Sequence, residues 1–397
     1  MSNFNLSKIQ ESIKKLNFDG WLIFDFRGSN DYAMQTLSIP KEAHLTRRFF
    51  YYIPKEGTPV KIVNGIEAFH LDHLPGTKLT YSHRESLEKH LAGLLRPGLK
   101  IAMEYSPMNN IPYVSKVDAG TIEFVKSFGA EIYSSGDLIS LFSAVWTKEQ
   151  YEENKQAANA LYEIVELSFG KIKKALLSNS PITEYDVQSF IMQEFERRKM
   201  VTDSPAIVGV NENSANPHYS PDEKTFKPIK KGDFVLIDLW AKMNTPAGTI
   251  ADITWTGYAG DKILPEHEKV ATVVFEARDA AFQFLEKRFK EGKEVRGYEV
   301  DDAARNIIVR AGYGDYFIHR TGHSITTETH GSGANMDNFE TKDERLVLPS
   351  TSFSIEPGIY LTGNFGVRSE IDVFITADGK VLQTGKERQK KVVPILA

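Results

Sequence analysis

Three of the chain's ten histidines, His319, His323 and His330, lie within twelve positions in the segment FIHRTGHSITTETHG. His319 and His323 have the i, i+4 spacing of a helical metal pair, but Gly322 and the β-branched residues that follow argue against a helix. We therefore expect strand and loop here. Neutral imidazole is a natural metal ligand, so one of the three could bind a metal. The alternative is surface or hydrogen-bonded core histidines.

Two acidic residues interrupt apolar strands, Asp238 in FVLIDLW and Glu356 in SFSIEPGIY. A buried ionised carboxylate shifts its pKa or recruits a cation, and for one such acid an arginine partner would suffice. Asp252 follows Asp238 by fourteen positions, and Glu370 follows Glu356 by fourteen. The midpoint of each pair falls in a turn-rich stretch, so we expect each pair to face across a hairpin. Opposed like charges destabilise a sheet, and divalent metal held by oxygen and imidazole explains both pairs.

The composition narrows the function classes. The net charge of -5 supplies no basic field, so nucleic-acid binding is not expected. The chain has no cysteine, which excludes disulfides, thiolate nucleophiles and sulfur-based metal sites. No run approaches the roughly 18 apolar residues that a membrane-spanning helix needs, and the amino terminus has no apolar signal core. We expect a cytoplasmic protein that does not bind membranes.

The elements that must position these residues suggest two domains, as the length of 397 residues predicts. Helical and strand patterns alternate in residues 1–147, where WLIFDF, RRFFYYIP, PVKIV and KIAMEY are predicted strands. This part is expected to be an α/β domain. In residues 148–397, long helical patterns are followed by antiparallel strands, which predicts an α+β domain.

The order Asp, Asp, His, Glu, Glu, carried by LIDLW, ADITWT, RTGHS, SIEPGIY and VRSEIDV, resembles the pita-bread metallopeptidases. This family includes prolidase, aminopeptidase P, methionine aminopeptidase and the metal-free creatinase. GYGDYFIHRTGH and FSIEPGIY are specific matches. The resemblance covers the whole chain, because two-domain members carry a smaller α/β creatinase-like domain ahead of the pita-bread catalytic domain. It is strongest to the two-domain Xaa-Pro peptidases.

The resemblance implies a site with two divalent metal ions, with manganese first and cobalt, zinc or iron as alternatives. Asp238 would bind one ion, Asp252 and Glu370 would bridge both, and His323 and Glu356 would complete the second. Glu356 would also take or relay the proton of the attacking water. The implied reaction is hydrolysis of a peptide or amide bond in a small peptide, by an Xaa-Pro dipeptidase or aminopeptidase P type of enzyme. A homodimer is expected by the same resemblance.

Four further residues acquire roles by resemblance. His218 in NPHYSP, His330 in ETHG and His319 match the histidines that face the substrate. Arg368 lies two positions before Glu370, on the same strand face, where it is expected to hold that carboxylate in place. The alternative for Arg368 is a solvent-facing ion pair with Asp372 or Glu340.

The sequence also departs from the family pattern. Trp240 stands where the family usually has glycine, and Trp255 stands where it usually has arginine. These tryptophans are either core residues or part of a reshaped pocket. Ser324 to Thr327 differ from the prolidase pattern, and GSGANMDN lacks the arginine that prolidases use for the substrate carboxylate. Two alternatives therefore stay open: a non-peptidase of the same superfamily, such as an amide or amidine hydrolase or a metal-dependent lyase, and a non-catalytic scaffold.

Overall fold

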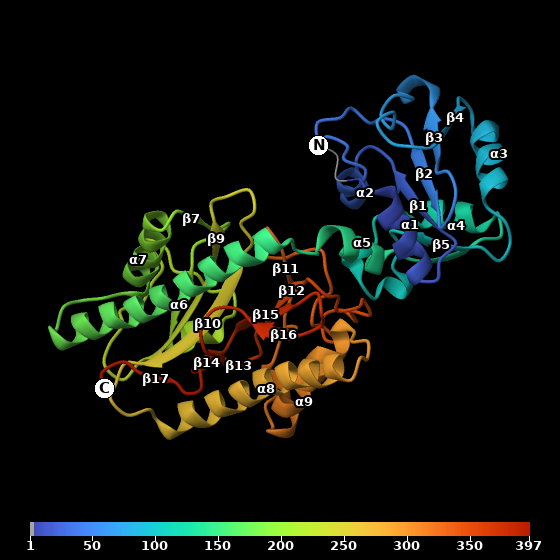
Figure 1. Cartoon of the computed structure of the whole chain (residues 1–397). Coiled ribbons are helices and arrows are strands. Elements are labelled where there is room, and N and C mark those ends of the chain that lie inside the picture. The colour runs from blue at the N-terminus through green and yellow to red at the C-terminus, as the bar shows by residue number, and fades with distance from the viewer. Residues whose placement is uncertain (1–3) are drawn as a thin grey trace. The chain divides into compact units, whose positions relative to one another are not determined.

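The computed structural model describes residues 4–397 and divides the chain into two compact units, 1–143 and 144–397 (Figure 1). This division falls four residues before the boundary predicted between residues 147 and 148. Each unit has its own sheets and its own hydrophobic clusters, as expected for a chain too long for one core.

The first unit is built on a six-stranded sheet with the strand order β4-β3-β2-β1-β5-β6. Only β2 among these strands is antiparallel to its neighbours. The predicted strands RRFFYYIP and PVKIV are confirmed as β2 and β3, which form an antiparallel hairpin across Lys55, Glu56 and Gly57. The strands are β1 Gly20–Asp25, β2 Phe49–Pro54, β3 Val60–Asn64, β4 Thr77–Tyr81, β5 Lys100–Met103 and β6 Glu131–Ser134.

Helices cover both faces of this sheet, and each face has its own apolar cluster. Ile9 and Ile13 of α1 pack into one cluster, whereas Leu87 and Leu91 of α3 pack into the other. The helices are α1 Leu6–Lys15, α2 Asp31–Thr36, α3 Arg84–Leu94, α4 Ala119–Lys126 and α5 Gly136–Ser143. The predicted α/β class of this unit is thereby confirmed.

Four helices of the second unit follow the apolar stripes in the sequence. Thr183 and Asp186 form a capping box at the start of α7, and each side chain accepts a hydrogen bond from the other residue's backbone N–H. Gly292 and Gly312 follow α8 and α9 with φ of 65° and 84°, a left-handed conformation that suits glycine after a helix. The helices are α6 Lys148–Leu177, α7 Glu184–Arg197, α8 Pro265–Lys290 and α9 Gly297–Arg310.

The strands of the second unit form mainly antiparallel sheets, as predicted. The first sheet has the order β17-β10-β9-β7, with β8 also paired to β9. The second has the order β11-β12-β15-β16, and β13 pairs with β14. The strands are β7 Met200–Val201, β8 Ile207–Val210, β9 Phe234–Met243, β10 Ala251–Tyr258, β11 Ser324–Ile325, β12 Ser352–Ile355, β13 Gly358–Leu361, β14 Phe365–Arg368, β15 Ile371–Ile375, β16 Val381–Gln383 and β17 Val393–Pro394.

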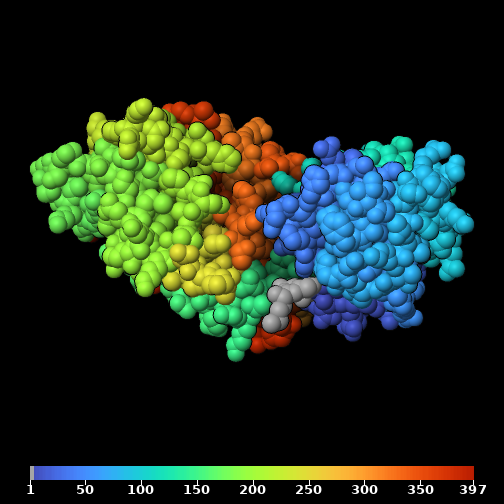
Figure 2. All heavy atoms as spheres, turned by 90° about the horizontal axis from the view of Figure 1, so that it is seen from above, coloured from blue at the N-terminus to red at the C-terminus, as the bar shows by residue number. Residues whose placement is uncertain are grey.

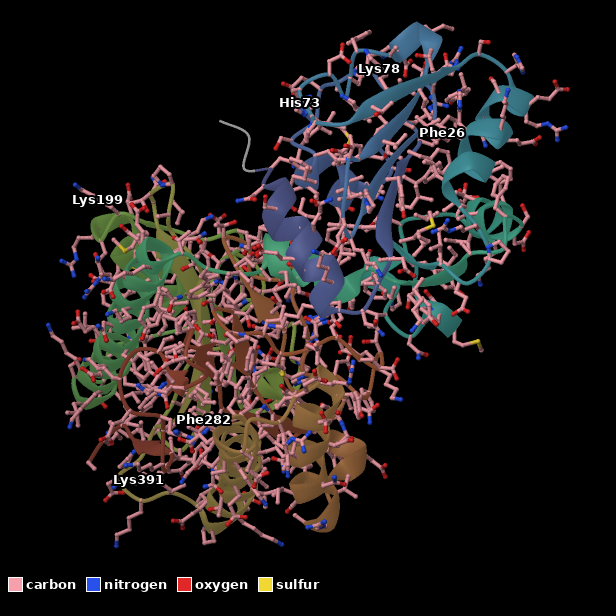
Figure 3. The ribbon with its side chains drawn as sticks, turned by 45° about the vertical axis from the view of Figure 1, so that its right-hand side comes forward. Phe26, His73, Lys78, Lys199, Phe282 and Lys391 are labelled. Atoms are coloured by element: carbon pink, nitrogen blue, oxygen red, sulfur yellow. The ribbon has the colours of Figure 1, made fainter. Side chains whose placement is uncertain are left out.

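Two apolar clusters hold the helices of this unit against its sheets. One joins α6 and α7 to β9 and β10, and the other joins α8 and α9 to β12 through β15. Phe282, labelled on α8 in Figure 3, belongs to the second cluster, and Arg388 stacks on its ring at 4.1 Å. In the view of Figure 2, the visible face of this unit is formed largely by its green and yellow segments. This α+β arrangement confirms the predicted fold class.

Candidate metal centre

The five predicted metal ligands come from five short segments of the second unit. Asp238 lies in β9 and Asp252 in β10, while His323 directly precedes β11. Glu356 follows β12, and Glu370 precedes β15. His323 therefore lies in an extended segment rather than a helix, as its β-branched neighbours predicted.

The predicted facing of Asp238 and Asp252 is wrong by two positions. Asp252 pairs with Trp240 in the β9–β10 hairpin, and Asp238 pairs with Thr254. The cause is the turn, in which the Gly248 N–H donates to Thr245 O, so that the tip lies beyond the predicted midpoint at Thr245. Because the offset is even, the two aspartates still share one face of the hairpin.

Glu356 and Glu370 face each other as predicted. Ile355 pairs with Ile371 on one side of them, and Gly358 pairs with Arg368 on the other. The two pairs share one register, so residues 356 and 370, which lie between them, are opposite each other along the two chain segments. The hairpin turns at Gly363, the predicted midpoint, where φ is 80°.

The ligand atoms converge on a small space. Asp252, His323 and Glu370 each offer one atom, and these three atoms lie within 4.8 Å of one another. His323 Nε2 is 3.4 Å from Glu356 Oε1 and 3.8 Å from Asp252 Oδ2. His323 Nδ1 is 3.3 Å from the carbonyl oxygen of Ser324, which can only accept a hydrogen bond. The proton therefore belongs on Nδ1, and the lone pair of Nε2 faces the acids.

Asp238, Asp252 and Glu370 are buried, Glu356 is largely buried, and these carboxylates repel one another. Burial first, and then the neighbouring acids, raise the pKa of Asp252 and of Glu370 well above the usual range. Burial also raises the pKa of Asp238 and of Glu356. Asp238 Oδ1 and Asp252 Oδ1 have no hydrogen-bond partner among the described residues. Buried, unpartnered oxygen donors beside an imidazole fit a divalent cation.

Asp372 is a further buried acid that the sequence interpretation did not assign to the site. Its Oδ2 accepts a hydrogen bond of 2.8 Å from the backbone N–H of Asp252, and its Oδ1 has no partner among the described residues. Burial raises its pKa well above the usual range. The alternation of residues along a strand puts Asp372 on the same face as Glu370, which is the signal that could have found it.

The predicted role of Arg368 is wrong in one respect. Its Nη2 donates directly to Asp238 Oδ2, not to Glu370. Its Nε donates at 3.0 Å to Thr254 Oγ1, and that hydroxyl in turn donates at 2.8 Å to Glu370 Oε2. Arg368 is buried, so it does not form the alternative solvent-facing pair. The strand register explains the contacts of Arg368, because Thr254 lies opposite Asp238 and also bonds to Glu370.

His319 is tied to the same network. Its Nδ1 is 2.6 Å from the carbonyl oxygen of Arg320, so Nε2 is free of a proton and accepts from Tyr360 Oη at 2.7 Å. Tyr360 Oη also accepts from Arg368 Nη1 at 3.2 Å. Burial, followed by Arg368, lowers the pKa of His319 to about 3. His319 therefore extends the support of Asp238 through Tyr360 and Arg368.

His330 and His218 are both exposed. The His330 ring stands edge-on to the His323 ring, with a centroid distance of 4.6 Å. Desolvation and the neighbouring His323 lower the pKa of His330 to about 4, so its ring is neutral at pH 7. His218 follows Pro217, whose carbonyl oxygen lies 3.5 Å from Arg368 Nη1. The loop that carries His218 thus borders the cluster, but no described contact joins the His218 ring to it.

Comparison with known proteins agrees with this geometry. The model of metallopeptidase family M24 matches residues 152–377. The chain belongs to metallopeptidase family M24. The match includes Asp238, Asp252, His323, Glu356 and Glu370, and it confirms the resemblance drawn from the sequence.

Relatives of this M24 chain carry dipeptidase names. YkvY of Bacillus subtilis, a candidate dipeptidase, is 32% identical over 257 residues, which span 64% of either chain. The Xaa-Pro dipeptidase of Lactobacillus delbrueckii subsp. lactis is 34% identical over 216 residues, 54% of either chain. The chain thus spans less than two thirds of the length of these relatives. The prolidase structure of Thermococcus sibiricus has a TM-score of 0.57 and 25% identity, with 98% of both chains covered.

Among residues 4–397, none of the helices combines the length and the apolar composition that crossing a membrane requires.

Proposed function

We propose that the chain is a dinuclear metal-dependent hydrolase that cleaves a peptide bond in small peptides, of the Xaa-Pro dipeptidase or aminopeptidase P type, in the cytoplasm. The observation that carries the proposal is the convergence of Asp252, His323 and Glu370, whose ligand atoms lie within 4.8 Å of one another, together with the buried Oδ1 atoms of Asp238 and Asp252, which have no hydrogen-bond partner within residues 4–397. The dipeptidase names of its M24 relatives support the substrate class.

The residues that would hold the metal ions are Asp238, Asp252, His323, Glu356 and Glu370. Manganese is the first candidate, because the donors are carboxylates and one imidazole. When bound, two such ions lower the pKa of a water molecule and polarise the scissile carbonyl.

Glu356 is our candidate for the proton transfer. Its side chain is 16% exposed, against 6% for Asp252, so it can exchange a proton with water. Its Oε1 accepts a hydrogen bond of 3.1 Å from Ser354 Oγ, which fixes the carboxyl group. In this role Glu356 would accept a proton from the nucleophile and return it to the leaving amine.

The exposed histidines would act on the substrate. A neutral His330 ring carries one N–H, which can donate to the substrate carbonyl and to the tetrahedral intermediate. His218 would donate from the opposite loop. His319 would act through Tyr360 and Arg368, by holding Asp238 in place, rather than by contact with the substrate.

The test combines metal analysis with a peptide panel. The purified protein is analysed for bound metal, then assayed with manganese or cobalt on Xaa-Pro dipeptides, Xaa-non-Pro dipeptides and longer peptides. We expect about two metal equivalents and cleavage of at least one peptide class. Bound metal without any peptide cleavage would instead favour an amide or amidine hydrolase or a lyase. Absence of metal binding would favour a scaffold.

A further inference from the structure

The β9–β10 hairpin has two faces with different surroundings. Ile237 and Leu239 on one face pack under α6 and α7, where Trp255 meets the Tyr162 ring edge-on at 5.8 Å. The other face carries Asp238 and Asp252. Trp255, which pairs with Ile237, is half-buried and packs against this core, away from the acids. Trp240 lies on the face of the acids, two positions after Asp238.

Trp240 is the cross-strand neighbour of Asp252. Directly opposed residues in an antiparallel pair have Cβ atoms about 5 Å apart, so the indole begins beside a predicted metal ligand. Part of the ring packs against a small apolar cluster, and the residue remains only half-buried. The members of this cluster are Trp146, Ile250, Ile325 and Phe374. The indole therefore starts on the strand face that carries Asp238 and Asp252, and it remains partly open to solvent.

A hydrogen bond fixes the orientation of this ring. Trp240 Nε1 donates to Asp203 Oδ1 at 2.6 Å. The other carboxylate oxygen, Asp203 Oδ2, accepts from Thr329 Oγ1 at 2.9 Å. Thr329 directly precedes His330. One exposed aspartate therefore links the indole to the residue next to a histidine that we assign to the substrate.

A second link ties the same loop to β9. Lys242, the next residue on this face, donates through Nζ to the carbonyl oxygen of Thr327 at 2.6 Å. The Gly331 N–H donates to Ser324 O at 2.6 Å, which closes the other end of the loop. The loop from residue 326 to residue 330 is thus held at both ends. Trp240 and His330 therefore present a rim of defined shape.

We propose that Trp240 is a specificity-determining residue, the apolar wall of a subsite that takes a large apolar side chain next to the scissile bond. Asp203 is the positioning residue that holds this wall. The inference rests on the proposed peptidase function. An indole face gains contact area with a leucine or phenylalanine side chain, whereas alanine offers little area. The Asp203 carboxylate at the rim disfavours an acidic side chain.

The first test measures selectivity in the full chain with manganese. Phe-Pro, Leu-Pro, Ala-Pro and Asp-Pro are assayed with the wild type, W240A, W240F and the core control W255F. W240A should lower kcat/KM for the Phe and Leu substrates by about 10-fold, mainly through KM, and leave Ala-Pro within about 3-fold. W240F, which keeps an apolar ring, should retain most of the preference. An equal loss on all four substrates by W240A, or the same selectivity change in W255F, would overturn the proposal.

Asp203 is tested by a conservative rescue. D203A should lose part of the preference for large side chains, because the indole loses its acceptor. D203N keeps an acceptor oxygen for the indole N–H and should restore most of that preference. If D203A preserved the full preference, or if D203N behaved like D203A in the KM values, the positioning role would be refuted.

A third measurement needs no turnover and separates this inference from the proposed function. Cobalt(II) alone is titrated into the metal-free protein while tryptophan emission is recorded. A cobalt ion bound beside Asp252 should quench Trp240 most strongly, so the total quenching should be clearly smaller in W240F than in the wild type, and smaller than in W255F. Equal quenching in W240F would contradict the placement of the indole, even if peptides are cleaved. Failure to cleave any peptide, with Trp240-dependent quenching, would reject the peptidase function and the substrate contact but not the placement.

Discussion

At the scale of single residues, the centre joins side chains that destabilise one another in the absence of a cation. Asp252 and Glu370 each have a pKa raised by burial and by the charge of neighbouring acids. Arg368 offsets part of this charge by direct contact with Asp238, and its positive charge also counteracts the raised pKa of Glu356 and of Glu370. The protein therefore retains several buried acids with a single direct basic partner among the contacts described above, which is the condition that metal binding relieves.

Asp252 and Glu370, the two acids proposed to bridge the metal ions, give the first prediction. D252A or E370A should lose bound manganese and reduce turnover by at least about 100-fold, since each removes an oxygen donor shared by the cluster. Metal content by plasma emission and peptide hydrolysis are the measurements. D378A, which changes an exposed acid paired with Lys380, is the control and should retain both. A D252A protein with full metal content and activity would disprove the bridging assignment.

Arg368 gives a second prediction. R368M removes the basic partner of a buried aspartate. The free energy of unfolding of the metal-free protein should therefore fall by about 3–5 kcal/mol. Manganese should recover part of this loss, because the cation replaces the missing charge. Urea denaturation with and without manganese measures both effects. Y360F, which removes a hydroxyl from the same network but keeps the ion pair, should be affected less. Equal stability of R368M and the wild type without metal would contradict the prediction.

At the scale of elements, much of the architecture could be predicted because it rests on local patterns. The stripe on α6, the capping box of Thr183 and Asp186, and the glycines after α8 and α9 all depend on residues close in the chain. The strand face shared by Glu356 and Glu370 followed from the turn at Gly363. The family motif then supplied the order of the five proposed ligands.

Contacts between segments that are distant in the chain could not be predicted from the sequence in the same way. The Thr245–Gly248 turn shifted the β9–β10 register by a local hydrogen bond that a midpoint estimate does not include. Arg368 reaches Asp238 because strands separated by more than a hundred residues meet, so its nearest acid in sequence was not its partner. The link from Trp240 through Asp203 to Thr329 joins three segments in the same way.

The helix α8 gives a prediction on pH and stability. His267 lies buried among Phe234, Tyr258 and Phe365, and burial lowers its pKa below 6.5. Its Nδ1 has no hydrogen-bond partner among the described residues. The unfolded chain gains a proton below about pH 6.5 while the folded one does not, so the stability contributed by this histidine is present above that pH and lost as the pH falls.

H267F removes this titration while it keeps an aromatic ring. Between pH 6.5 and 5, the free energy of unfolding should fall less steeply in H267F than in the wild type, by up to about 1.4 kcal/mol per pH unit. Urea midpoints at several pH values are the measurement. Between pH 7 and 8 the two proteins should show parallel curves. Identical slopes below pH 6.5 would show that His267 does not titrate on unfolding.

At the scale of the whole molecule, the two units should respond differently to metal. All five proposed ligands belong to residues 144–397. A ligand that binds only the folded state adds about 2.7 kcal/mol at a concentration of 100 times Kd. For a unit of this size the corresponding rise in Tm is about 5–10 °C.

Calorimetry of the full chain measures this difference. The transition temperature of the second unit should rise with manganese and fall with a chelator. The transition temperature of residues 1–143 should change by less than about 1 °C. Magnesium at the same concentration controls for ionic strength. Parallel shifts of both transitions would indicate that metal acts on more than the acid cluster.

The shared register around Glu356 and Glu370 has a consequence for changes in chain length. The pairing of β13 with β14 has the same register as the pairing of β12 with β15. The length of the loop at Gly363 therefore determines that Glu356 and Glu370 lie opposite each other. A single residue inserted at that tip would leave every strand sequence intact, yet would turn one glutamate away from the other. Length variation among related chains should therefore spare this tip more than the outer loops of the same unit.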